Sequence, residues 1–142
     1  MRSRVDPGQG RQGTSLSSHT YHPERGDIIH LNLSPSAGHE LTGPHFALVI
    51  STARFSKATG FTIVVPGTTK YHAEQRLAGQ QLMVKLPPIS TLERDGWLYP
   101  QQVRSLDYRD RNASFVAKLD DDDFLIDVME RVRALIDPDS LV

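Results

Sequence analysis

Short apolar runs, separated by polar, Gly-rich or Pro-rich stretches, occur throughout residues 26–119. Runs of this length bounded by turn residues are typical of β-strands. The run at 45–51 is almost entirely apolar, which predicts a central strand. Pro66-Gly67 is expected to end the strand at 61–65. The pattern favours no single element over 105–111. It predicts strands at residues 28–33, 45–51, 61–65, 81–86, 97–99 and 114–119, with a loop over 34–44.

The C-terminal segment has a helical pattern instead. Apolar residues share one face of a helix at positions 124, 125, 128, 132, 135 and 136. The run Asp120–Asp123 provides a cap and favours the positive end of the helix dipole, and Pro138 follows the helix end. We therefore predict a helix over 124–136, whose acidic start needs no ligand to explain it.

Several short strands followed by one helix predict a mostly β fold with helices, of the α+β class. The expected architecture is a small, strongly bent antiparallel sheet or small barrel with the helix packed on it. The length of 142 residues fits one domain. Residues 1–23 are rich in Gly, Ser, Arg and Gln, so we expect a flexible tail there and a domain over 24–142.

The composition excludes several kinds of chemistry. The chain has no cysteine, which excludes disulfides, thiolate zinc sites, iron–sulfur clusters and a cysteine nucleophile. No apolar run approaches the ~18 residues needed to cross a bilayer. The first residues also lack the apolar centre of a secretory signal. We expect a cytoplasmic protein with no membrane partner.

The formal net charge of −1 conceals an asymmetry, because residues 119–142 hold eight acidic and two basic side chains. The first 118 residues are correspondingly basic. A basic body could bind a polyanion, with the acidic end kept away from it. An acidic surface helix explains the same charges without any ligand, and the charges alone leave both interpretations open.

The six histidines form no recognised metal motif. The chain has no HExxH pair, and His72-Ala73-Glu74 matches only half of a zinc deaminase signature whose other half needs cysteines. Neither GxGxxG nor GxxxxGK[ST] occurs. We therefore predict no metal and no cofactor.

A more coherent group of polar residues lies at the ends of the predicted strands, where the side chains could converge on one rim of a small sheet. Each also has a plain structural interpretation: a loop or strand histidine, a turn threonine, or an arginine paired with Asp107. The group consists of His39, His45, Thr68, Thr69, Gln101, Gln102 and Arg104.

Five motifs follow one another along the chain: Arg25-Gly26-Asp27-Ile28-Ile29, 34–40 (SPSAGHE), 46–51 (FALVIS), 65–69 (VPGTT) and 102–107 (QVRSLD). This ordered set resembles the MazF/PemK/Kid toxins of type II toxin–antitoxin pairs. The resemblance covers residues 25–137 and implies a small SH3-like twisted antiparallel β-barrel with a C-terminal helix, related to CcdB. It also implies a homodimer, a cognate antitoxin partner, and metal-independent, sequence-selective cleavage of single-stranded mRNA.

The resemblance also suggests roles for the polar group. His45 would be a general acid or base with His39 as its partner, and Thr68 would act with them at the scissile phosphate. The remaining residues would contact RNA: Thr69, Arg104, Gln101 and Gln102.

Four positions depart from the family pattern. The family usually has arginine and proline where this chain has His45-Phe46, and an acidic residue where it has Gln101. An arginine that some members use for catalysis is Tyr99 here. A permanent charge and a bidentate donor are lost at position 45. A non-catalytic module that binds antitoxin or a gyrase-type target, with a degenerate nuclease site, is therefore the alternative hypothesis.

Overall fold

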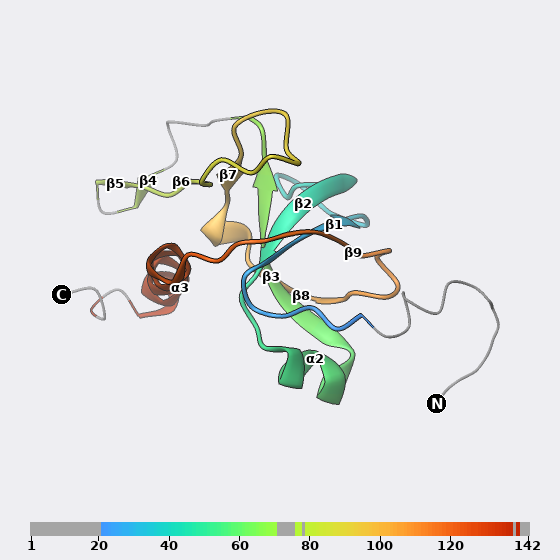
Figure 1. Cartoon of the computed structure of the whole chain (residues 1–142). Helices are drawn as coiled ribbons and strands as arrows, with labels where there is room; N and C mark the ends of the chain where they lie inside the picture. Colours follow the sequence, from blue (N-terminus) through green and yellow to red (C-terminus); the bar gives the residue numbers. More distant parts are fainter. Residues whose placement is uncertain (1–20, 71–75, 78, 138, 140–142) are drawn as a thin grey trace.

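A computed structural model describes residues 21–70, 76–77, 79–137 and 139 (Figure 1). The elements are β1 (Asp27–Asn32), β2 (Pro44–Val49), α2 (Ala53–Thr59), β3 (Phe61–Thr68), β4 (Arg76–Leu77), β5 (Gln80–Gln81), β6 (Val84–Lys85), β7 (Trp97–Leu98), the 3-10 turn η1 (Pro100–Gln102), β8 (Arg104–Asp107), β9 (Ser114–Lys118) and α3 (Asp122–Ile136).

Seven strands form one antiparallel sheet in the order β6-β7-β3-β2-β1-β9, with β8 also paired to β3. The α+β fold class is thus confirmed, and β2 lies inside the sheet as its apolar run predicts. The sheet is twisted but does not close into a barrel, since β6 and β9 end the order (Figure 1). The strand predicted over 81–86 is divided: residue 81 belongs to β5 and residues 84–85 form β6, whereas 82, 83 and 86 lie in neither strand.

The prediction that Pro66-Gly67 ends the third strand is wrong, because β3 continues to Thr68. On one edge, β3 pairs first with β8 and then, at Gly67 and Thr68, with β7. Pro66 lacks an N–H, but its carbonyl still accepts a hydrogen bond from the Tyr99 backbone at 2.8 Å. The strand therefore passes through the proline and carries the following residues to the end of the sheet.

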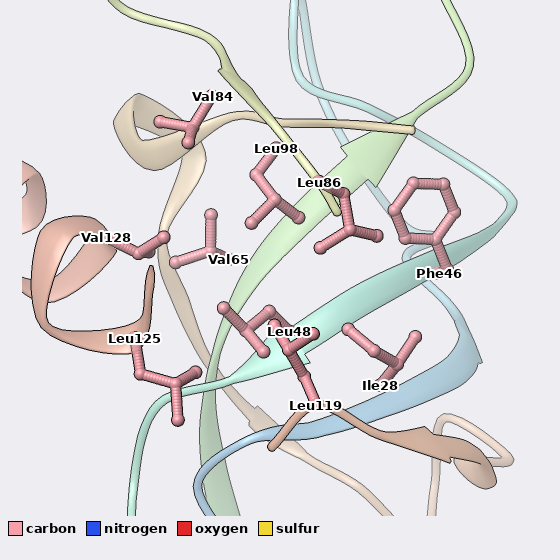
Figure 2. Close-up of a cluster of buried hydrophobic side chains, with 10 residues drawn as sticks. All are labelled: Ile28, Phe46, Leu48, Val65, Val84, Leu86, Leu98, Leu119, Leu125 and Val128. Carbon is pink, nitrogen blue, oxygen red and sulfur yellow. The ribbon is translucent and has the colours of Figure 1, made fainter. Parts of the chain in front are cut away.

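Alternation along the strands divides the buried side chains between the two faces of the sheet. On β1, Ile28 faces one cluster, and Ile29 and Leu31 face the other. Helix α3 covers the first face through Leu125 and Val128. Figure 2 shows that cluster, which consists of Ile28, Phe46, Leu48, Val65, Val84, Leu86, Leu98, Leu119, Leu125 and Val128.

The predicted C-terminal helix is confirmed as α3. Its cap is Asp121, whose Oδ1 accepts a hydrogen bond from the Phe124 backbone at 3.1 Å. Two further aspartates lie in the first turn and Arg133 in the last, as the helix dipole favours. No helix in the described part of the chain is long and apolar enough to span a membrane.

Two elements were missed or left undecided. Helix α2 has only seven residues, too few for a clear apolar period; Thr52 caps its start, and Gly60, at φ 78°, ends it. The segment 105–111 contains most of β8 followed by a turn. Pairing with β3 decides that this segment begins as a strand.

Residues 21–23, which the sequence placed in the tail, pack against the domain. The Tyr21 hydroxyl donates to Asp27 Oδ2 at 2.7 Å, and its ring lies edge-on to Phe115. Pro23 is fully buried, and its carbonyl accepts from the Ser56 hydroxyl at 2.8 Å. These three residues therefore belong to the folded part of the chain, and residues 1–20 lie outside the described residues.

Gly67 provides a test of the packing between β2 and β3. A Cβ there would lie 2.1 Å from Cε2 of Phe46, whose ring is 7% exposed. We predict that G67A lowers the free energy of unfolding by about 1–3 kcal/mol, because the added methyl displaces a packed ring. Urea denaturation measures this change in the free energy of unfolding. In an F46L background, G67A should lower the free energy of unfolding by less. Equal costs in both backgrounds would exclude this contact as the cause.

Tyr21 predicts a loss of stability in alkali. Burial, and next the hydrogen bond to Asp27, raise the pKa of Tyr21 above its ordinary value of 10.0. Its neutral form is therefore favoured in the folded protein, so this contribution is complete below pH ~10 and is lost as the pH rises toward the folded pKa. We expect the free energy of unfolding to fall above pH ~10. The fall should be shallower in Y21F, and identical pH profiles for the two proteins would contradict the assignment.

Candidate active site

His45 lies at the end of β2 beside the last residues of β3. Ala47 pairs with Pro66, and this register continued by two residues brings His45 opposite Thr68. The half-buried imidazole is held on both sides: Nδ1 lies 3.0 Å from the Gly67 carbonyl oxygen and Nε2 lies 3.1 Å from that of Thr42. The neighbouring Phe46 points to the opposite face and into the core (Figure 2).

These two contacts constrain the chemistry of the ring. Both neighbours are carbonyl oxygens, which accept hydrogen bonds and cannot donate them. A neutral imidazole can donate to one of them, whereas a doubly protonated ring can donate to both. To exchange a proton with a substrate in either direction, a nitrogen must first turn away from its carbonyl. Because both nitrogens face acceptors, the ring is placed to present N–H donors, which favours His45 as a proton donor once one contact opens.

The two threonines after Pro66-Gly67 have different environments. Thr68 is buried, at 8% exposed, and its Oγ1 accepts from the Lys70 backbone at 3.2 Å. That contact is the turn chemistry expected of such a residue, and a hydroxyl that accepts one bond still has its own proton to donate. Thr69 is exposed.

An open hollow of about 430 Å³ brings three of the predicted residues together. Its lining consists of Ala37, His39, Glu40, Gln101 and Gln102. Glu40 was not among the predicted site residues, although it stands next to His39 in the sequence. Its Oε1 accepts from the Ala37 backbone at 2.8 Å, which holds the carboxylate at the rim of the hollow.

Arg104 and Gln102 hold the loop between β1 and β2 (residues 33–43). From β8, the Arg104 guanidinium donates to the Leu41 carbonyl at 2.8 Å and to the Leu33 carbonyl at 3.1 Å. Gln102 Oε1 accepts from the Leu41 backbone at 2.7 Å. The Arg104 side chain thus joins the first and last parts of the loop.

The salt bridge with Asp107 suggested by the sequence is not formed. The Arg104 guanidinium is directed at loop carbonyls instead. Asp107 Oδ1 instead accepts from the backbones of Arg109 at 3.1 Å and Asp110 at 3.2 Å. Arg104 and Gln102 therefore position the loop that carries His39. Within the described ranges, no group of three or more His, Cys, Asp or Glu side chains could hold a metal ion.

A comparison with protein families matches residues 24–136 to the PemK-like, MazF-like toxins of type II toxin–antitoxin systems. The chain belongs to this family. It is 34% identical over 97 residues to the endoribonuclease toxin MazF of Escherichia coli K12, spanning 66% of this chain and 77% of that protein.

Solved structures agree. The crystal structure of MazF from Deinococcus radiodurans matches with a TM-score of 0.67 and 34% identity, covering 82% of this chain and 97% of that one. A MazE–MazF structure from the same organism matches with a TM-score of 0.64 and 30% identity over the same shares.

The loop contacts of Arg104 can be tested by hydrogen exchange. R104K keeps the charge but loses the fixed pair of donors that the guanidinium directs at the Leu33 and Leu41 carbonyls. Each charge-assisted bond is worth about 1.5–3 kcal/mol. We therefore expect amide exchange over residues 33–43 to accelerate roughly tenfold or more. The control R54K changes an exposed arginine on α2 and should leave the loop unaffected. Unchanged loop exchange in R104K would show that the arginine does not hold it.

Proposed function

We propose that this chain is a metal-independent endoribonuclease toxin that cleaves single-stranded mRNA. The observation that carries the proposal is the His45 ring, fixed between the Gly67 and Thr42 carbonyls beside the buried Thr68. Membership of the MazF-like family and 34% identity to a protein named as an endoribonuclease support it.

Such cleavage uses the ribose 2′-hydroxyl as its internal nucleophile. The 2′-oxygen attacks the adjacent phosphorus, a base takes its proton, and the bond to the 5′-oxygen breaks as an acid protonates that leaving oxygen. The products are a 2′,3′-cyclic phosphate and a 5′-hydroxyl. The protein must supply the two proton transfers and stabilise the charge on the phosphorane.

The contacts of each residue suggest how this work is divided. His45 acts as the acid: both of its nitrogens face carbonyl acceptors, and one N–H turns from its carbonyl to protonate the leaving oxygen. His39 is exposed on the hollow and acts as the base, with the Thr68 and Thr69 hydroxyls donating to phosphate oxygens. Arg104 and Gln102 act indirectly, through the loop they hold, and Gln101 lines the hollow that receives RNA.

A non-catalytic binding module remains the second candidate. The observation that favours it is that both nitrogens of His45 and the guanidinium of Arg104 are already bonded to backbone carbonyls. On that hypothesis these groups are structural, and the chain acts by binding antitoxin or another protein.

The proposal includes a cognate antitoxin, a homodimer and a cytoplasmic location. The similar MazE–MazF structure supports the antitoxin, and the basic first 118 residues suit a partner with an acidic segment. Phe115 on the edge strand β9 is 51% exposed, which supports contact with another chain there.

The test is cleavage of a long RNA in EDTA, with the ends of the products mapped. We expect H45A to cleave roughly 10²–10⁴-fold more slowly, the usual effect of removing a positioned acid or base. The control is H30A, which removes an exposed strand histidine on β1.

Cleavage by H45A at the wild-type rate would remove His45 from the mechanism. If the wild-type protein in excess binds RNA or antitoxin but yields no product, the binding module is correct instead.

A further inference from the structure

We propose that Arg111 is a positioning residue for this cleavage, acting on His45 through Ser34 and Thr42. The reaction itself is the proposed function above, and the inference rests on it. Arg111 belongs to the turn between β8 and β9, and no feature of its sequence context singled it out.

Three hydrogen bonds, linked through Ser34 and Thr42, connect Arg111 to His45. Arg111 Nη1 donates to the Ser34 carbonyl at 2.8 Å. The Ser34 hydroxyl lies 2.8 Å from that of Thr42 and accepts from the Gly43 backbone at 2.9 Å. The Thr42 carbonyl lies 3.1 Å from His45 Nε2. Arg111 therefore fixes Ser34, and Ser34 fixes Thr42. The Thr42 carbonyl is one of the two that hold the His45 imidazole.

The turn that carries Arg111 is itself rigidly held. Asp107 Oδ1 accepts two backbone N–H bonds at its start, and the Ala113 backbone donates to the Tyr108 carbonyl across it at 3.0 Å. Asn112 takes φ 55°, a left-handed conformation that asparagine tolerates. The Arg111 carbonyl accepts from the Asn32 backbone at 2.9 Å, which joins the turn to the end of β1.

The Leu33 carbonyl gives Arg111 a second contact at the start of the loop. It accepts from Arg111 Nη1 at 2.8 Å, from Arg104 Nη1 at 3.1 Å and from the Ser36 hydroxyl at 2.9 Å. In the part of the chain that the structure describes, no carboxylate lies within 4.0 Å of either guanidinium. Both charges are therefore directed at the start of the loop rather than neutralised by an acid.

The contacts of Arg111 indicate which residue could replace it. Arg111 makes its two bonds to the Leu33 and Ser34 carbonyls from a single nitrogen, Nη1, which a lysine ammonium can imitate. Lysine should thus substitute for arginine at position 111, whereas methionine, which has no donor, should not.

The experiment measures kcat and KM for cleavage of a short RNA in EDTA by R111M, S34A, the double variant and R111K. Displacement of a catalytic group by a fraction of an ångström to an ångström lowers rates steeply. We expect kcat to fall roughly ten- to hundredfold in R111M and S34A, while KM changes less than about threefold. The kcat of the double variant should fall no further than that of R111M alone, because R111M and S34A break the same path of contacts from Arg111 to His45. R111K should recover most of the wild-type kcat.

The control R54M removes the same charge from the exposed face of α2 and should retain wild-type kcat. Urea denaturation of each variant establishes that the protein assayed is folded. An unchanged kcat in R111M, losses that multiply in the double variant, or a loss equal to the unfolded fraction would each overturn the proposal.

A second measurement separates this inference from the proposed function. The NMR signals of the His45 ring should shift in R111M, and those of His30 should not. If the wild-type protein does not cleave RNA, the proposed function fails and positioning for cleavage fails with it. The ring signals then decide whether Arg111 holds His45 at all, and unmoved signals would refute the path.

Discussion

The loop between β1 and β2 buries few apolar side chains, so polar contacts must hold it in one conformation. Arg104 provides the central contact by joining the Leu33 and Leu41 carbonyls across the loop from β8. A guanidinium suits this task because its donors point in fixed, divergent directions. The position of His39, the shape of the hollow and the Thr42 carbonyl that holds His45 all depend on this contact.

The consecutive residues His45 and Phe46 show how one strand separates chemistry from stability. Alternation sends the imidazole to the loop and the phenyl ring to the core under α3. The ring then occupies the space above Gly67, so the same glycine admits Phe46 with its missing side chain and holds His45 with its carbonyl. The site and the core are thus coupled through a single residue of β3.

Much of the architecture follows from local patterns that packing reinforced. The strands near 28–33, 45–51 and 114–119 and the helix over 124–136 lie where the apolar periods place them. The patterns failed where a partner decided the outcome. Pro66 remains in a strand because Tyr99 bonds its carbonyl, and Tyr21 to Pro23 are folded because Asp27 and Ser56 bind them.

The sequence alone determined the family and the order of the main elements, because these depend on short-range patterns and ordered motifs. Only the tertiary structure decided what the candidate site residues touch. Arg104 stands in a strand and Arg111 in a turn, yet both donate to the carbonyl of Leu33, more than 70 residues earlier. Backbone carbonyls are present at every position, so no sequence pattern marks which of them a guanidinium will reach.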